Sequence, residues 1–102
     1  MAGVFSIQQQ IVYVLFDTGS TLSFISKHIA PYCDLNIQPL IPPIKVETPI
    51  GSSEVNQVAR NVEITMNGRA FPSNLILLPM KDIDIILGMD WLLHYHANID
   101  CT

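Results

Sequence analysis

Short apolar runs alternate with turn-forming residues along the whole chain. Residues 11–16 are apolar throughout and rich in β-branched and aromatic side chains, with glutamines before them and Asp17-Thr18-Gly19 after them. This composition predicts a strand that is buried on both faces. Residues 62–66 instead alternate apolar and polar positions, and Asn67-Gly68 then supplies the pair that favours a tight hairpin turn.

The remaining apolar runs predict further strands and one or two short helices, so the fold class is mostly β. Further strands are predicted at residues 4–7, 44–48, 54–58, 74–78 and 83–87, and the proline-rich residues 38–43 are the longest candidate linker. Ser26 is placed to cap a short turn that Pro31 limits. Asp90 is placed to cap a helix over residues 91–96.

Length and composition predict a single domain that spans residues 1–102. The chain has 102 residues, and 49% of them are hydrophobic, which is ample for one core. A domain this small has a large surface for its volume. We therefore expect part of the apolar material to be buried against a partner.

Charge and hydropathy exclude several classes of function. Nine acidic and five basic residues give a formal net charge of −4, which disfavours binding to nucleic acid. The longest apolar run, residues 11–16, is far shorter than the roughly 18 residues that suggest a membrane span. No basic stretch precedes an apolar segment at the N-terminus, so we expect a cytoplasmic protein. Cys33 and Cys101 could form one bridge, but we expect both to be thiols.

The most informative tetrapeptide is Asp17-Thr18-Gly19-Ser20, directly after the first apolar run. A carboxylate at the end of a buried strand suits a positioned acid or base, because the glycine lets backbone N–H groups approach it. The Ser20 hydroxyl is expected to donate to one carboxylate oxygen and to leave the other facing water or substrate. The alternative is an ordinary Asx turn, in which Asp17 bonds only local backbone groups.

Two histidines close in sequence, His94 and His96, could be combined with His28 and a cysteine into a zinc site. Their spacing is poor, because His94 and His96 would diverge on a helix and the chain has no Cys-x-x-Cys. We therefore expect no metal site and no cofactor.

A second apolar run, residues 85–87, ends at Gly88, and Met89-Asp90-Trp91-Leu92 follows it. With this run the chain resembles the retroviral-type aspartic proteases, and most closely the protease segment of gypsy-type LTR retrotransposon polyproteins. The resemblance covers nearly the whole chain, with its motifs in order. The matching segments are residues 14–21 (catalytic motif), 23–26 (the segment after it), 46–51 (flap), 85–92 (strand and helix) and 97–101 (closing strand).

The resemblance implies a small closed β-barrel with one lobe per chain. The catalytic strand and the strand that contains Ile86, Leu87 and Gly88 would cross in a ψ-shaped arrangement below the active site. The implied site residues are Asp17 as the catalytic acid, Thr18 in a hydrogen-bonded contact across two subunits, Gly19 as a backbone contact to substrate, Ser20 in support of the catalytic loop, and Pro49, Ile50, Gly51 and Ser52 as a flap over the cleft.

One chain supplies only half of such a site. Peptide hydrolysis by two carboxylates needs one ionised and one protonated group. Each of the other aspartates is followed by something other than Thr-Gly or Ser-Gly, so the motif occurs once. We therefore expect a homodimer, in which the two Asp17 side chains meet on the two-fold axis.

The function implied by the resemblance is an aspartic endopeptidase that processes a retroelement Gag-Pol-like polyprotein. We expect its partners to be a second copy of the chain and a polypeptide substrate, with no nucleic acid and no membrane, in the cytoplasm or within virus-like particles. The alternative from another class is a non-catalytic dimerisation or peptide-binding module with the same fold. The intact motif at Asp17 favours the enzyme.

Overall fold

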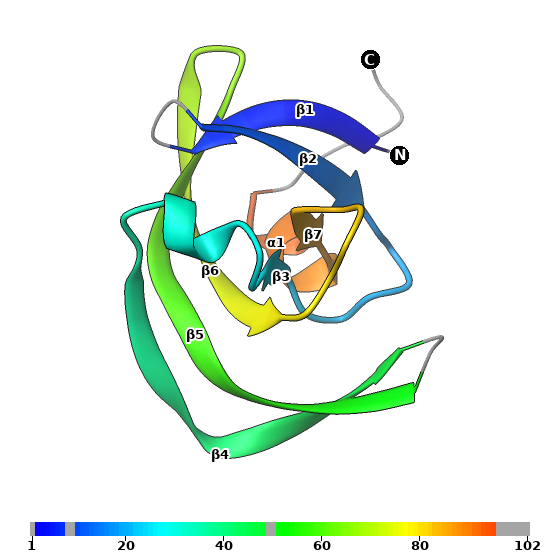
Figure 1. Ribbon diagram of the computed structural model, residues 1–102. Helices are drawn as coiled ribbons and strands as arrows, with labels where there is room; N and C mark the ends of the chain where they lie inside the picture. The colour runs from blue at the N-terminus through cyan, green and yellow to red at the C-terminus, as the bar shows by residue number, and fades with distance from the viewer. Residues whose placement is uncertain (1, 8–9, 49–50, 96–102) are drawn as a thin grey trace.

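The chain folds mainly into strands, with one short α-helix near its end. The computed structural model describes residues 2–7, 10–48 and 51–95, so the predicted closing strand at 97–101 lies outside the described residues. Within the described part, seven strands, a 3-10 segment and one α-helix follow one another (Figure 1). These elements are β1 (Ala2–Ile7), β2 (Gln10–Phe16), β3 (Phe24–Ser26), η1 (Ala30–Tyr32), β4 (Asn36–Thr48), β5 (Gly51–Met66), β6 (Arg69–Leu78), β7 (Ile85–Leu87) and α1 (Met89–His94).

Six of the described strands close into a barrel. The hydrogen-bonded order of the strands is β1-β2-β7-β3-β6-β5-β4. β1 also pairs with β5, through Ser6 with Thr65 and Ile7 with Ile64, so the sheet returns on itself. β4 stays outside this ring and forms a long hairpin with β5 (Figure 1). The predicted all-β fold with a small closed barrel is therefore confirmed.

β2 is buried on one face only, so the prediction of two buried faces is wrong. Val12 and Val14 are fully buried, whereas Ile11 is 63% exposed and Tyr13 is 58% exposed. β2 forms an antiparallel ribbon with β1, and it pairs with the parallel strand β7 only from Val14 onward. An antiparallel ribbon can leave its outer face in water, which a continuous apolar run does not reveal.

The proline-rich stretch is part of an edge strand rather than a linker. β4 runs through residues 38–43, with a shift of its register against β5 between Pro39 and Ile44. Prolines are tolerated there because β4 lies at the edge of the sheet, where one side of the strand needs no donors. The strands predicted at 44–48 and 54–58 are therefore parts of longer strands, and the short strand β3 was not predicted.

The predicted hairpin at Asn67-Gly68 is confirmed. Asn67 has a φ of 52° and Gly68 a φ of 76°, as a tight turn between twisted strands requires. β5 and β6 pair directly across it, from Met66 with Arg69 onward.

The turn that Ser26 was predicted to cap is present at residues 27–29, and it does not extend into an α-helix. The Ser26 hydroxyl accepts the N–H of His28 at 3.1 Å, as a cap would, but a turn follows it and then the 3-10 segment η1. Pro31 lies in the first turn of η1 and removes a donor there. The short helical segment therefore begins later than predicted.

α1 begins two residues before the predicted helix, with Gly88 rather than Asp90 at its N-cap. Asp90 instead lies in the first turn, where a carboxylate interacts favourably with the helix dipole. Trp91 is 7% exposed, and its Nε1 donates to the Ser73 hydroxyl at 2.8 Å. Trp91 is therefore a core residue, and its ring packs α1 against the barrel.

A close approach of two backbones joins the start of α1 to the loop after β2. A Cβ at Gly88 would lie 2.3 Å from the Leu22 carbonyl oxygen and 2.6 Å from the Ser20 carbonyl oxygen. The Ser20 carbonyl also accepts the N–H of Met89 at 2.8 Å. Only glycine fits at this contact, so the loop and the helix start are packed as one unit.

We expect Gly88→Ala to destabilise the protein strongly, because the added methyl group meets backbone atoms. The free energy of unfolding should fall by about 3 kcal/mol or more, measured by urea denaturation. Gly68→Ala is the matched control, because a Cβ at Gly68 meets no atom within 4 Å. That variant bears only the conformational cost of its positive φ, about 1–2 kcal/mol. Equal losses in the two variants would contradict the steric explanation.

Candidate active site

Asp17 lies where β2 meets β7. These strands run parallel with Phe16 opposite Leu87, and the Asp17 N–H donates to the Leu87 carbonyl oxygen at 3.0 Å. β3, which follows the Asp17 loop, pairs with the other edge of β7 in the antiparallel direction. The strand of Ile86 and Leu87 and the following Gly88 therefore lie beside the loop that carries Asp17.

The Asp17 carboxylate is held by its own loop. Its Oδ1 accepts the N–H of Gly19 at 2.9 Å, and the Ser20 N–H donates to the Asp17 carbonyl oxygen at 3.1 Å. A Cβ at Gly19 would lie 3.2 Å from the same Oδ1, so glycine allows the close approach. The Asx turn and the positioned carboxylate are thus the same feature. Among the described residues, no group donates a hydrogen bond to Oδ2, and Asp17 is half-buried.

The hydroxyl of Ser20 does not bond Asp17, so that part of the prediction is wrong. It donates to the Leu22 carbonyl oxygen at 2.7 Å, which closes the loop on itself. The backbone N–H of Gly19 makes the hydrogen bond to the carboxylate that was expected of the hydroxyl, as in an Asx turn. Thr18 is exposed, and its hydroxyl has no hydrogen-bond partner within the described part of the chain.

Ser23 links the loop to α1, and sequence reasoning missed it. Its side chain is 1% exposed, and its hydroxyl accepts the Gly88 N–H at 2.9 Å and donates to Asp90 Oδ1 at 2.5 Å. The same Oδ1 accepts the Trp91 N–H at 2.7 Å. A hydroxyl can donate and accept at once, so serine satisfies both partners. The signal in the sequence was a single polar residue within the otherwise apolar residues 22–25.

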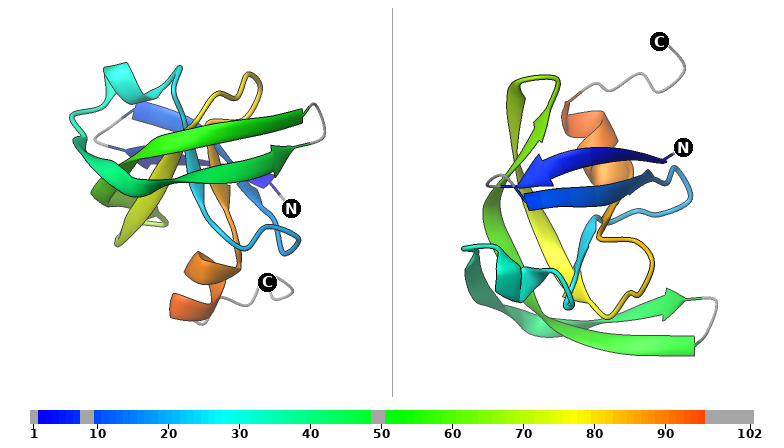
Figure 2. Two further views of the ribbon diagram at one scale, coloured as in Figure 1. Left: turned by 90° about the horizontal axis from the view of Figure 1, so that it is seen from below. Right: turned by 45° about the horizontal axis from the view of Figure 1, so that its top comes forward.

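A cleft of about 650 Å³ opens beside Asp17. The loop after β2 forms one wall, and the β4–β5 hairpin, whose free end lies on the same side of the barrel, forms the other (Figures 1 and 2). Two of the apolar residues that line it, Phe24 and Leu78, belong to a hydrophobic cluster that is separate from the main barrel core. The others pack against that cluster. The apolar lining residues in or against this cluster are Leu22, Phe24, Ile44, Val46, Leu78, Met80 and Ile86.

Of the four flap residues predicted from the sequence, the structure describes Gly51 and Ser52. Gly51 begins β5, and Pro49 and Ile50 lie outside the described residues. Ser52 is exposed, and its hydroxyl lies 3.2 Å from each carboxylate oxygen of Glu47. Ser52 does not line the cleft found here; its neighbour Ser53 does.

Two apolar residues of the hairpin line the cleft, of which Val46 was within the predicted flap segment and Ile44 was missed. Ile44 and Val46 are half-buried, and both line the cleft and pack against the second hydrophobic cluster. The alternation of apolar and polar residues in 44–47 contained this signal, since it places two apolar side chains on one face of the strand.

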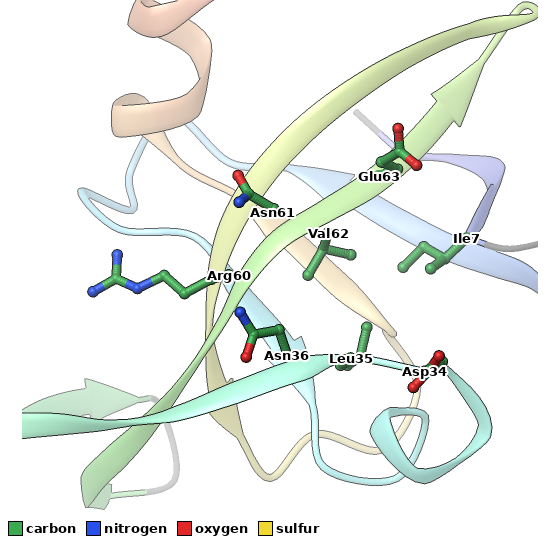
Figure 3. Close-up of a pocket in the computed structure, with 8 residues that line it drawn as sticks. All are labelled: Ile7, Asp34, Leu35, Asn36, Arg60, Asn61, Val62 and Glu63. Atoms are coloured by element: carbon green, nitrogen blue, oxygen red, sulfur yellow. The ribbon is translucent and has the colours of Figure 1, made fainter.

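A smaller recess of about 170 Å³ on the outside of the barrel does not bring its charged groups together. Figure 3 shows Arg60 and Glu63 directed away from each other, with Asp34 at the far side of the recess. Binding sites need a few convergent polar groups, and this recess does not present them. The cleft beside Asp17 is therefore the better candidate for chemistry.

Within residues 2–7, 10–48 and 51–95, no group of three or more His, Cys, Asp or Glu side chains could hold a metal ion. Cys33 is a buried free thiol, and burial raises its pKa, with a further contribution from the Asp84 carboxylate. A thiol of this kind is a poor nucleophile at neutral pH. Cys101 and His96 lie outside the described residues. None of the helices described is long and apolar enough to span a bilayer.

Comparison with solved structures shows which proteins share this fold. The retroviral protease-like domain of Ddi1 from Leishmania major is similar with a TM-score of 0.77 and 19% identity, over 98% of this chain and 80% of that one. The EIAV protease, in complex with the inhibitor HBY-793, is similar with a TM-score of 0.74 and 19% identity, over 96% of this chain and 89% of that one. At this level of identity the likeness concerns the fold alone. No curated protein matches the chain.

The family comparison agrees with the fold. A family model described as retroviral aspartyl protease matches residues 1–102. The chain therefore belongs to the retroviral aspartyl protease family.

Proposed function

We propose that the protein is an aspartic endopeptidase that acts as a homodimer, with Asp17 of each chain as its catalytic group. The observation that carries this proposal is the Asp17 carboxylate, fixed on one oxygen by the Gly19 N–H and lining a cleft of about 650 Å³. A carboxylate at the wall of an apolar cleft is suited to acid and base chemistry on a bound peptide.

The reaction needs two carboxylates in different protonation states. The ionised one takes a proton from water, and the oxygen of that water attacks the peptide carbon, while the protonated one donates to the carbonyl oxygen. When the tetrahedral intermediate breaks down, the C–N bond cleaves and the leaving nitrogen takes a proton from the pair. One chain offers a single Asp17, so the second carboxylate comes from a second copy of the chain.

The surroundings of Asp17 support such a dimer. Thr18 is exposed beside it, with no hydrogen-bond partner among the residues described, and it is suited to bond the same segment of the other copy. We assign the backbone of Gly19 to contact with substrate. We assign the hairpin end with Pro49, Ile50, Gly51 and Ser52 to covering the cleft and excluding water from it.

The substrate of this enzyme is an extended polypeptide with apolar side chains, because the lining of the cleft is mostly apolar. We place the activity in the processing of a Gag-Pol-like polyprotein of a retroelement, in the cytoplasm or within virus-like particles. The sequence resemblance to gypsy-type retrotransposon proteases supports this assignment.

We expect Asp17→Asn to reduce kcat/KM for an apolar peptide by at least about a thousandfold, because the amide can neither take nor give the proton. Asp82→Asn is the control, since Asp82 is an exposed carboxylate in the segment between β6 and β7 and should leave turnover unchanged. Turnover by Asp17→Asn equal to that of the wild type would remove Asp17 from the mechanism. Peptide binding without cleavage in the wild type, at high protein concentration, would identify a binding module instead.

Specific activity should rise with protein concentration until the dimer is saturated, because a single chain holds half of the site. Sedimentation over the same concentration series provides the dimer fraction, and the two curves should coincide. Full activity at concentrations where the protein sediments as a monomer would refute the two-chain site.

The pH profile of kcat/KM should be bell-shaped, with an acidic to weakly acidic optimum. At low pH both carboxylates are protonated and no base remains, and at high pH both are ionised and no acid remains. Assays over about pH 3 to 8 test this dependence. A maximum above neutral pH would contradict the shared proton.

A further inference from the structure

We propose that Ser53 is a specificity-determining residue, which gives the cleft a preference for peptides with a small hydrogen-bonding side chain, such as Ser, Thr or Asn, at one position near the scissile bond. This inference rests on the proposed peptidase function and extends it to the choice of substrate. It assigns to one side chain of the hairpin a direct contact with a side chain of the peptide.

Two neighbouring serines lie on opposite faces of the hairpin. In the β4–β5 ladder, Ser53 is directly opposite Val46, and Ser52 is directly opposite Glu47. Residues opposite each other in an antiparallel pair share one face of the sheet, and neighbours along a strand alternate between faces. Val46 lines the cleft and packs against the second hydrophobic cluster, so Ser53 is on the inner face. Ser52 is on the outer face, where it bonds Glu47.

The inner face around Ser53 is otherwise apolar. Val55, the next residue of β5 on this face, is 1% exposed, and Ile44 pairs with it across the ladder. Ser53 itself is half-buried and lines the cleft together with Ile44 and Val46. Lys45 and Glu47, which alternate with Ile44 and Val46 along β4, also line the cleft. On its own face of the hairpin, the Ser53 hydroxyl is a neutral polar group among apolar side chains.

The Ser53 hydroxyl is not used by the protein itself. Within the described residues it has no hydrogen-bond partner, whereas the Ser20 hydroxyl, also in the cleft lining, is bonded to the Leu22 carbonyl oxygen. No fully buried side-chain polar atom of the described part lacks a partner, so the Ser53 oxygen is accessible from the cleft. Thr21 is the other hydroxyl residue of the lining without a hydrogen-bond partner in the described part, but it is exposed, whereas Ser53 is half-buried.

A half-buried hydroxyl discriminates between peptides because binding removes its water. A peptide side chain that can donate or accept restores the lost hydrogen bond, whereas an aliphatic side chain of similar size leaves the hydroxyl unpaired. A neutral hydrogen bond of this kind corresponds to a factor of about three to ten in kcat/KM. This preference is added to the apolar selectivity of the rest of the cleft.

The test compares matched peptides that differ at one position, with Ser, Thr or Asn against Ala or Val. At one position the wild type should have a higher kcat/KM for the peptide with the hydrogen-bonding residue than for its aliphatic counterpart. Ser53→Ala should reduce the ratio of these two kcat/KM values by about three- to tenfold. Ser53→Thr keeps the hydroxyl and should keep the ratio. Ser52→Ala removes the hydroxyl of the outer face. Any effect on kcat/KM should therefore be the same factor for all peptides, and the ratio between peptides should stay unchanged.

An unchanged ratio in Ser53→Ala, or an equal change in Ser52→Ala, would overturn the assignment. Binding of the same peptides to Asp17→Asn, with and without Ser53→Ala, measures the preference without turnover. If the wild type does not cleave but the binding preference is lost with Ser53→Ala, the peptidase function is wrong and the contact of Ser53 stands. If all peptides bind both proteins alike, the contact itself is wrong.

Discussion

The close contact between Gly88 and the backbone of the loop after β2 is the constraint on which the site depends. Two carbonyl groups of that loop occupy the space where a side chain at position 88 would lie. Ser23 adds a buried hydroxyl that bonds the Gly88 N–H on one side and Asp90 on the other. Because these contacts involve mainly backbone atoms, the position of Asp17 does not depend on flexible side chains. The carboxylate is therefore held in place within a single chain, which is the preorganisation that catalysis by charged groups requires.

The apolar residues of the chain are divided between two clusters with different roles. The main core fills the barrel, and its members from β2, such as Val12 and Val14, are fully buried. The second cluster lies under the hairpin, and several residues packed against it, including Leu22 and Val46, are only partly buried because they form the wall of the cleft. A bound peptide would complete the burial of these side chains, so part of the apolar surface that the composition shows in excess is available to the substrate.

Local patterns in the sequence predicted most of the strands and the turn at Asp17, but not the relations between distant segments. The Asn67-Gly68 turn and the Asp17 motif depend on a few neighbouring residues, and both lie where the sequence indicates. The strand through Pro39 and its neighbours was missed, because prolines are permitted only by its place at the edge of the sheet. The roles of Ser20 and Ser23 were not separable in the sequence, because the partner of a hydroxyl depends on which backbone groups the fold brings to it.

Assembly and protonation are linked in the proposed dimer. Two carboxylates about 3 Å apart cannot both be ionised, so the pair holds one proton. Each free chain holds a half-buried Asp17 in the loop after β2, and association of two such chains near neutral pH takes up a proton from water. A state that binds more protons is favoured as the pH falls, so the same acidification that provides the catalytic acid also strengthens the association of the chains. The backbone contacts of the loop fix Asp17 Oδ1 and the Asp17 main chain within each copy, so in the proposed dimer the two carboxylates would stay close together.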